Sequence, residues 1–387
     1  MDSRSHKKFL LVTILPQTMT DTQALEDLKE VKSLVETYGG EVCDLIVQRR
    51  EIHDKGMYVG KGKLQEIVKV VVNLSIDIVV LNGIVRAGQI FEIKNELQKE
   101  TFAIEVWDRV DLILEIFALH AHTAESKLQI ELASMRHMGP RIYGMGMVLS
   151  RQGGGIGTLG VGETNTELMK RHWKQQIKKI QGKLNKHVDE RRRQLIRREK
   201  NGVQTVSIVG YTNAGKTSLF NHLTNKKNLV ENSLFVTLDS SSGKVFLPNL
   251  KKEVLFSDTI GFIQNLPLTL IEAFTSTLLE SMHADVLLFV IDSSDENMEK
   301  KIRVVEKILY GLMIERKKRI YVFSKIDIHN VHRKEDIWED FKQYDPQFIS
   351  VKTGVGISQL LRTVEKALQH QPTEQTISSP RRKIVHV

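Results

Sequence analysis

The stretch Gly210-Tyr211-Thr212-Asn213-Ala214-Gly215-Lys216-Thr217 decides the fold of the second half of this chain. It follows the apolar run 206–209 and precedes a segment, 218–223, whose apolar residues have helical spacing. A strand, a glycine-rich loop and a helix in this order form a phosphate cradle, because backbone N–H groups at the helix start point towards the anion. In such a loop Lys216 contacts the β- and γ-phosphate oxygens, and the Thr217 hydroxyl binds Mg²⁺. An ordinary glycine turn is the alternative interpretation.

The composition is that of an ordinary soluble protein with two or three domains. The chain has 387 residues, of which 41% are hydrophobic and 27% are charged. A single cysteine, Cys43, cannot form an internal disulfide, which favours a reducing compartment. The apolar run 9–15 has no small-residue cleavage site, and no run is long enough to cross a bilayer. We therefore expect a cytoplasmic protein without stable membrane insertion.

The positive charge of the chain is concentrated in one segment. The net charge is +9, and residues 168–200 alone carry thirteen Lys or Arg residues against three acidic residues. Such charges repel one another unless an anionic partner offsets them. Because Trp173 is the only aromatic residue there, base stacking is disfavoured. We favour sequence-independent contact with an RNA phosphate backbone. The alternatives are a solvated helix and an anionic membrane surface, and the latter lacks a matching apolar stripe.

The first hundred residues alternate between strand-like and helix-like patterns, which predicts a small parallel sheet covered by helices. The expected strands are 9–15, 42–47, 76–81 and 102–107, and the expected helices are 22–38, 63–72 and 88–97.

Two long helical patterns follow, at 111–138 and 163–199, with a glycine-rich loop at 151–162 between them. Long consecutive helices with a flexible connection pair antiparallel, so we expect a protruding arm with the loop near its tip. The second α/β unit has expected strands at 206–209, 254–257, 286–291, 320–323 and 347–350. The predicted division is an α/β subdomain at 1–108, the arm at 109–200, a second α/β domain at 201–369 and a flexible tail at 370–387.

Two segments downstream of Lys216 complete a triphosphate site. Asp258-Thr259-Ile260-Gly261 follows a predicted strand, where an Asp can hold the magnesium shell and a Gly N–H can contact the γ-phosphate. Phe235-Val236-Thr237-Leu238-Asp239 lies between, in a loop of the kind that orders when a triphosphate binds. The predicted magnesium ligands are Thr217, Thr237 and Asp258. The predicted catalytic groups are Lys216, Thr237 and Gly261.

Two further segments predict that the base is guanine. Ser324-Lys325-Ile326-Asp327 follows a strand, and Asp327 can accept both the N1–H and the exocyclic amine of guanine, which adenine cannot match. Lys325 can lay its stem across the base. Ser350-Val351-Lys352 follows the last strand and offers backbone N–H groups to the guanine carbonyl. Four such segments in order predict a site for GTP or GDP with Mg²⁺.

The position after Gly261 is Phe262, where Ras-like enzymes carry the Gln that orients the attacking water. A phenyl ring cannot hydrogen-bond water. We therefore expect slow intrinsic hydrolysis that relies on Lys216, Mg²⁺, backbone groups around Thr237 and Gly261, or a group supplied in trans.

The chain resembles the HflX family within the translation-factor-related P-loop GTPases. The segments that carry the resemblance are 111–118 (DLILEIFA), 127–133 (KLQIELA), 154–158 (GGIGT) and 162–164 (GET). The resemblance covers nearly the whole chain and implies an N-terminal α/β subdomain, a helical arm and a Ras-like GTPase domain. It also implies a GTPase that binds the large (50S) ribosomal subunit and its rRNA through the arm, residues 109–200. We expect the protein to be monomeric.

The resemblance further implies that the protein splits stalled or idle ribosomes. We also expect that the ribosome stimulates hydrolysis and that the protein can lie peripherally at the membrane. In potassium-activated relatives the position of Asn213 helps to hold K⁺ beside the phosphates. Family members are also reported to bind ATP through the N-terminal part, and no residues here place such a site. The alternative is a GTP-gated binding protein for RNA or ribosome assembly that has little need for hydrolysis.

The chain departs from the family pattern at several positions. Ser324 stands where Asn is usual, and its shorter side chain is expected to lose contacts to the base and the phosphate loop. Val351 replaces the usual Ala, where only the backbone acts. In the arm loop, Leu159 and Val161 replace Arg and Pro, and Asn165-Thr166 replaces Gln-Leu.

Overall fold

The structure of the chain is a computed structural model. It describes residues 7–101, 103–152, 161–226, 228, 234–235, 241–264, 270, 274–312, 314, 318–328 and 334–369. Predictions for four residues of the 235–239 loop, for most of the glycine-rich loop and for the tail lie outside these ranges. The four are Val236, Thr237, Leu238 and Asp239.

The first half contains the predicted parallel sheet, with strand order β2-β1-β3-β4. Its strands are β1 (Lys8–Leu15), β2 (Glu41–Arg49), β3 (Ile78–Leu81) and β4 (Glu105–Asp108), and its helices are α1 (Asp21–Tyr38), α2 (Lys61–Leu74) and α3 (Ala87–Gln98). Both faces are covered, so β1 is a continuous apolar run whose alternate residues enter different cores. Phe9 and Leu11 face the core that contains α1, whereas Leu10 and Val12 face the core that contains α2 and α3.

The predicted helix at 111–138 is wrong, because the chain breaks into α4 (Arg109–His120) and α5 (Ala124–Gln152). Ala121 has an extended backbone (ψ 106°). The Thr123 side chain then accepts a hydrogen bond from the Ser126 backbone N–H at 3.1 Å, which caps the start of α5. The sequence signal for this break was therefore Thr123, three residues before Ser126.

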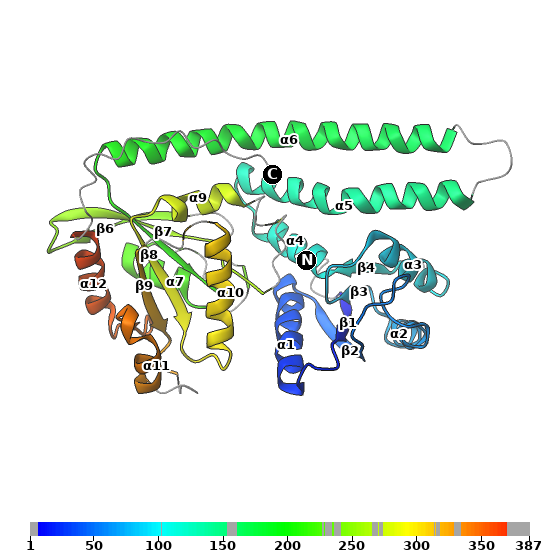
Figure 1. The fold of residues 1–387 in the computed structure, drawn as a ribbon, viewed down its shortest axis with the longest axis horizontal. Helices are drawn as coiled ribbons and strands as arrows, with labels where there is room; N and C mark the ends of the chain where they lie inside the picture. Colours follow the sequence, from blue (N-terminus) through cyan, green and yellow to red (C-terminus); the bar gives the residue numbers. More distant parts are fainter. Residues whose placement is uncertain are drawn as a thin grey trace.

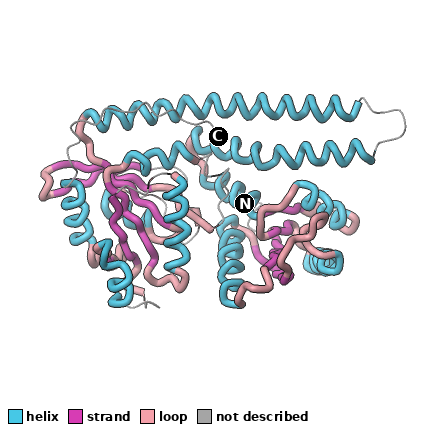
Figure 2. Tube along the Cα trace, in the orientation of Figure 1, coloured by secondary structure: helices cyan, strands magenta, loops and turns pink. Residues whose placement is uncertain are grey.

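The arm consists of α5 and α6 (Val161–Lys200), which lie side by side as the predicted antiparallel pair (Figures 1 and 2). Leu132, Ile180 and Leu184 form a small buried apolar cluster between the two helices. The Trp173 indole N–H donates to the Met135 carbonyl at 2.8 Å, which ties the helices together. None of the described helices is both long and apolar enough to span a membrane.

The second half contains a six-stranded sheet with order β10-β9-β8-β5-β7-β6. Its strands are β5 (Thr205–Gly210), β6 (Ser241–Leu247), β7 (Lys252–Asp258), β8 (Val286–Asp292), β9 (Lys318–Ser324) and β10 (Gln347–Phe348). Its helices are α7 (Lys216–Thr224), α9 (Thr275–His283), α10 (Met298–Gly311), α11 (Lys334–Phe341) and α12 (Ile357–Gln369), with a 3₁₀ turn, η1 (Lys342–Tyr344). The sheet is parallel except for β6, which pairs antiparallel with β7. Strand β6 was not predicted from the sequence, and β10 is shorter than the predicted strand 347–350.

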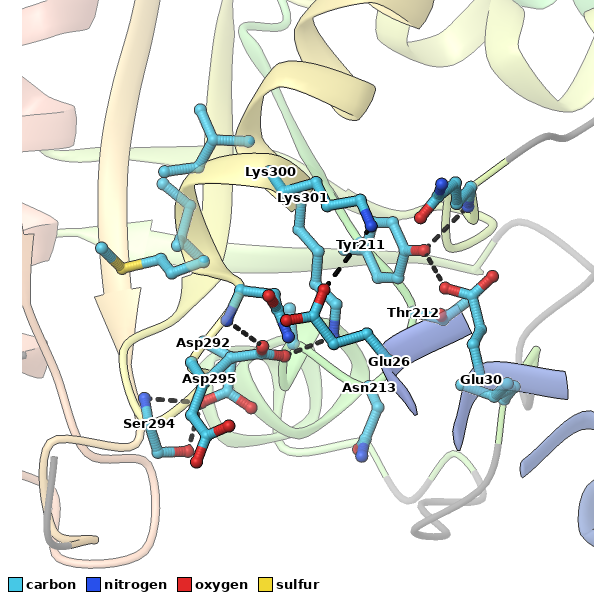
Figure 3. A pocket seen from close by; sticks show the side chains of 18 of the residues that line it. Glu26, Glu30, Tyr211, Thr212, Asn213, Asp292, Ser294, Asp295, Lys300 and Lys301 are labelled. Carbon is cyan, nitrogen blue, oxygen red and sulfur yellow. Dashed lines mark hydrogen bonds and ion pairs between the residues drawn. The ribbon is translucent and has the colours of Figure 1, made fainter. Parts of the chain in front are cut away.

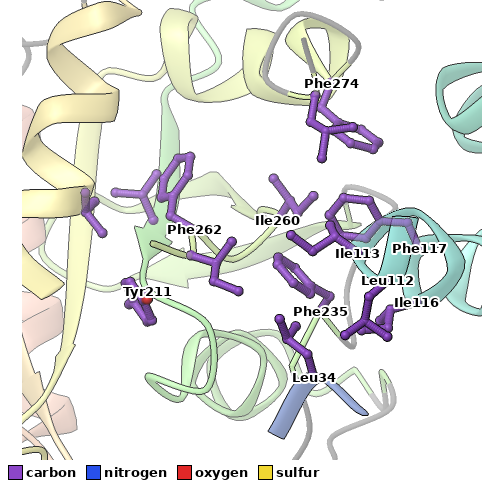
Figure 4. Packing of buried hydrophobic residues seen from close by; sticks show 14 of the residues in the cluster. Leu34, Leu112, Ile113, Ile116, Phe117, Tyr211, Phe235, Ile260, Phe262 and Phe274 are labelled. Atoms are coloured by element: carbon purple, nitrogen blue, oxygen red, sulfur yellow. The ribbon is translucent and has the colours of Figure 1, made fainter. Parts of the chain in front are cut away.

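One apolar core crosses from the first half into the second (Figure 4). Phe117 of α4 lies edge-on to Phe235, with ring centroids 4.6 Å apart, and edge-on to Phe274 at 4.9 Å. All three rings are buried. Helix α4 therefore packs against segments on either side of the β7 end, close to the phosphate loop.

Candidate nucleotide site

The phosphate loop has the predicted strand-loop-helix form, since β5 ends at Gly210 and α7 begins at Lys216. A Cβ atom on Gly210 would lie 2.3 Å from the Val290 carbonyl oxygen, so only glycine fits there. Gly215 (φ +89°) and Asn213 (φ +59°) both have left-handed backbones, which Gly and Asn adopt more readily than other residues. These three residues give the loop its tight path.

Lys216 lies inside this loop. Its ammonium is buried and donates to the Tyr211 carbonyl at 2.6 Å. Burial lowers the pKa of Lys216 to about 8, although the nearby Asp258 carboxylate opposes the shift. A buried ammonium favours an anionic partner. The site is therefore suited to a phosphate group.

Thr217 and Asp258 fit a magnesium ion. The Thr217 hydroxyl donates to Asp258 Oδ2 at 2.8 Å, and the other carboxylate oxygen, Oδ1, is buried without a hydrogen-bond partner among the described residues. Burial raises the pKa of Asp258 to about 6, despite the opposing Lys216 charge. Hydroxyl and carboxylate oxygens are the donors that Mg²⁺ prefers. The third predicted ligand, Thr237, lies outside the described residues.

Gly261 approaches the phosphate loop too closely for any side chain. A Cβ atom there would lie 2.7 Å from Thr212 Cγ2 and 3.0 Å from Lys216 Nζ. Its neighbours Thr259 and Ile260 serve the fold, because the Thr259 hydroxyl donates to the Ile208 carbonyl at 2.7 Å and Ile260 is buried in the apolar core. Of these three residues, Gly261 is the one that faces Lys216.

Phe262 is bound to the phosphate loop through its backbone. Its N–H donates to the Gly210 carbonyl at 3.1 Å, and its carbonyl accepts from the Thr212 N–H at 2.8 Å. The ring is buried in the apolar core. This placement agrees with the expectation that residue 262 does not orient water.

The two guanine segments meet where β9 and β10 end. The Ile326 N–H donates to the Ile349 carbonyl at 3.4 Å, and Lys325 (φ +61°) binds Asp292 through its ammonium at 2.7 Å. A hydrogen bond from the Ser350 hydroxyl lowers the pKa of Asp327, which keeps this exposed carboxylate ionised. An ionised, exposed carboxylate can accept the two guanine donors.

The expectation that Ser324 loses contact with the phosphate loop is wrong. The Ser324 hydroxyl is buried and lies 2.7 Å from the Ala214 carbonyl and 3.0 Å from the Ile291 carbonyl. The short side chain therefore still ties the guanine segment to the loop.

The sequence reading missed a polar cluster beside the loop (Figure 3). The Tyr211 hydroxyl donates to Glu30 of α1 and accepts from the Gln264 N–H at 2.7 Å. Arg109 of α4 pairs with Glu30 and reaches the Gln264 carbonyl at 3.3 Å. Burial and the Glu30 carboxylate raise the pKa of Tyr211, so the hydroxyl stays protonated and donates. The available signal was an Arg at the start of a largely apolar helix, because a charge that folding buries needs a partner.

A cavity of about 380 Å³ lies between α1 and the phosphate loop, next to this cluster. Glu26 and Lys29 line it from α1, Asn213 from the loop and Lys300 from α10. Lys300 pairs with Glu26 at 3.6 Å across the cavity edge (Figure 3). Carboxylates outnumber ammonium groups on its walls, but both charges are present: Glu26, Glu30, Asp292, Asp295 and Glu296 against Lys29, Lys300 and Lys301.

Comparison with known proteins agrees with this geometry. Three family models match: GTP-binding GTPase N-terminal at residues 25–118, GTP-binding GTPase Middle Region at 120–198, and 50S ribosome-binding GTPase at 205–325. A GTPase HflX from Caldanaerobacter subterraneus subsp. tengcongensis is 40% identical over 369 residues, which cover 95% of this chain and 82% of the relative. The GTPase HflX of Escherichia coli strain K12 is 34% identical over 361 residues, covering 93% and 83%.

A solved structure supports the fold as a whole. The crystal structure of an SsGBP and GDP complex has a TM-score of 0.50 and 26% sequence identity, and covers 94% of this chain and 98% of that one. Similarity therefore extends through the N-terminal sheet, the arm and the nucleotide-binding sheet. The second sheet carries a phosphate loop, a candidate magnesium pair and a guanine segment along one edge, and the relatives are GTPases of the HflX type. The chain therefore belongs to the HflX family of GTPases.

Proposed function

We propose that this GTPase binds the large ribosomal subunit through its arm and uses GTP to separate stalled or idle ribosomes. The observation that carries the proposal is the exposed positive charge of α6. Of its thirteen Lys and Arg residues between 168 and 200, ten are exposed: 171, 174, 178, 179, 183, 186, 192, 193, 197 and 200. Basic side chains spread over a protruding helix suit the phosphate backbone of rRNA.

The related family model, described as a 50S ribosome-binding GTPase, supports the same partner. In the proposal, the bound nucleotide determines when the arm binds the ribosome. Lys216 and Gly261 contact the γ-phosphate, and Thr217, Thr237 and Asp258 bind Mg²⁺. When bound, Mg²⁺ would neutralise charge on the β- and γ-phosphates. Lys216 would hold phosphate oxygens, and Asp327 would select guanine. The protein acts as a monomer in this scheme.

Sedimentation with large subunits through a sucrose gradient tests the partner. We expect co-sedimentation with a non-hydrolysable GTP analogue and much less with GDP. Replacing three exposed arm residues, Lys174, Lys178 and Lys183, by Gln should weaken binding and lower its salt dependence. The matched control replaces three exposed lysines outside the arm, Lys251, Lys252 and Lys307, by Gln. Equal loss in both variants would contradict arm-mediated binding.

A second candidate is a GTP-gated RNA-binding or ribosome-assembly protein that has little need for hydrolysis. The burial of Phe262 favours it, because this residue offers no group to the attacking water. The two functions differ in turnover. Splitting predicts that large subunits strongly raise GTP hydrolysis and that ribosomes separate into subunits. Binding alone predicts an unchanged hydrolysis rate and full association with the GTP analogue.

A K⁺ ion beside Asn213 is a separate part of the proposal. The left-handed backbone at Asn213 places this residue at the turn of the phosphate loop. Hydrolysis rates measured in KCl and in NaCl test it. Faster turnover in KCl that disappears in Asn213→Ala supports the ion, and equal rates in both salts would exclude it.

A further inference from the structure

Asp108, the last residue of β4, contacts helix α5 of the arm. Its carboxylate is fully buried, caps α4 by accepting from the Asp111 N–H at 2.9 Å, and contacts two residues of α5. His137 Nε2 lies 3.1 Å from Asp108 Oδ1, and Arg141 Nη2 lies 2.7 Å from Asp108 Oδ2. Arg141 also binds Asp111 at 2.6 Å. The Arg141 guanidinium engages both carboxylates, so this cluster is an ion-pair anchor and not a metal site.

Arg109, the next residue, contacts segments beside the nucleotide site. Its guanidinium is buried, pairs with Glu30, and donates to Asn82 Oδ1 at 2.9 Å and to the Gln264 carbonyl at 3.3 Å. Gln264 lies three residues after Gly261, which faces Lys216. Through Glu30, Arg109 is also linked to Tyr211 of the phosphate loop. Two consecutive residues at the start of α4 thus contact opposite parts of the molecule.

The part of α5 that Asp108 holds is a weak point in the helix. Pro140 lies inside α5, between His137 and Arg141, and a proline removes one helical hydrogen bond, which makes this turn easier to bend. On the other side of this turn, the Trp173 indole donates to the Met135 carbonyl. The turn around Pro140 is therefore held by Asp108 at the start of α4 and by Trp173 of α6. The distal arm extends from this turn.

We infer that Asp108 and Arg109 are positioning residues that link the nucleotide site to the direction of the arm at Pro140. A shift of the Gln264 backbone with the nucleotide would move Arg109, and Asp108 would transmit the movement to His137 and Arg141. Such a link requires that the two nucleotide states make different contacts with Arg109. The inference rests on the proposed function only in giving the arm a task.

Fluorine NMR of the full chain labelled with 5-fluorotryptophan tests this link. The three tryptophans give separate signals, of which Trp173 reports on the turn around Pro140 and Trp338, on α11, serves as the internal control. We expect the Trp173 signal to shift between GDP and a non-hydrolysable GTP analogue, both with Mg²⁺, while the Trp338 signal stays in place. A Trp173 signal that is identical in both states would overturn the inference.

Arg109→Lys supplies the decisive variant. It keeps a positive charge beside Glu30, but a single ammonium cannot span Glu30, Asn82 and Gln264 together. We expect the nucleotide-dependent Trp173 shift to fall by at least half, with nucleotide affinity changed less than about twofold. The control is Arg303→Lys, an exposed residue of α10, which should keep the full shift. An undiminished shift in Arg109→Lys would contradict the proposal.

Asp108→Asn tests the link from the arm side and stands in if Arg109→Lys fails to fold. It weakens the contacts to His137 and Arg141 without touching Gln264, so it should also reduce the Trp173 shift. The measurement contains no ribosomes. Failure of ribosome binding would therefore leave a positive result intact, and a missing Trp173 shift would leave ribosome binding untouched.

Discussion

Phe117 of α4 and Phe235, in the segment before the predicted Thr237 ligand, meet edge to face with ring centroids 4.6 Å apart. Phe235 has a left-handed backbone (φ +59°), which is rare for a bulky residue. This conformation costs about 1 to 3 kcal/mol, which the surrounding packing must offset. The burial of both rings supplies that packing. Phe235, the one described residue of the 235–239 segment, is thus packed against the N-terminal half of the chain.

Removing the Phe117 ring should destabilise the protein. Phe117→Ala deletes a fully buried ring that contacts both Phe235 and Phe274, so we expect the free energy of unfolding to fall by about 3 to 5 kcal/mol. Chemical denaturation measures it. Phe246→Ala is the control, since this β6 ring is 60% exposed and should cost less than about 1 kcal/mol. Similar losses in both variants would contradict the packing described.

Removing the Lys216 ammonium should abolish tight nucleotide binding. In Lys216→Met the stem remains but the buried charge is lost, and charged hydrogen bonds to phosphate contribute about 1.5 to 3 kcal/mol each. We expect the affinity for a fluorescent GTP analogue to fall about 100-fold or more. Lys244→Met, an exposed lysine paired with Glu253, should bind normally. Unchanged affinity in Lys216→Met would remove this residue from the site.

Changing Asp327 should change the preferred base. In Asp327→Asn, one acceptor becomes a donor, so the two guanine donors are no longer both matched and GTP affinity should fall about 100-fold. Xanthine carries a carbonyl in place of the amine, so the variant should bind XTP better than GTP. Competition titrations with GTP, XTP and ATP give the order. A variant that still prefers GTP would argue against a base contact.

Stability at alkaline pH should depend on His137. Burial alone lowers the pKa of His137, but hydrogen bonds to Asp108 and Asp111 outweigh it and raise the pKa to about 9. Because the folded pKa lies above the unfolded value, the protonated ring stabilises the fold fully below about pH 6.5, and this contribution is lost as the pH rises through about 9. The charged groups that face the ring are Asp108, Asp111 and Arg141.

The difference in unfolding free energy between wild type and His137→Gln should therefore shrink by on the order of 3 kcal/mol between about pH 6 and pH 10. Denaturation curves for both proteins across this range measure it, and titrations elsewhere cancel in the difference. A constant difference would show that the pKa of His137 is the same in the folded and unfolded states.

The sequence predicted those features that local pattern determines. The phosphate loop was found because Gly210, Gly215 and Lys216 stand at fixed spacing, and the buried strands β1, β5 and β8 were found because both faces of each are apolar. Strand β6 was missed because it is an edge strand whose first half, with Ser241, Ser242 and Lys244, is polar. The break at Ala121 was missed because the apolar spacing continues across it.

Long-range polar contacts could not be predicted from local sequence patterns. Glu30 lies 181 positions before Tyr211, and Arg109 lies 155 positions before Gln264, so no spacing rule relates them. Ser324 shows the reverse error. A comparison of side-chain lengths predicted a lost contact, whereas the approach of two backbones, at Ala214 and Ile291, lets a shorter side chain reach both.

A hinge at the weakened turn around Pro140 would give the arm the mechanics of a lever. Twelve residues of α5 extend beyond it, which is about 18 Å at the rise of an α-helix. By simple geometry, a tilt of about 10° at this turn would carry the far end of α5 through about 3 Å, which lies between the helix shifts of about 1 to 2 Å and the one-turn displacements of about 5.4 Å in switching proteins. A small shift of the Gln264 backbone beside the nucleotide can thus become a displacement comparable to the width of a side chain at the far end of α5.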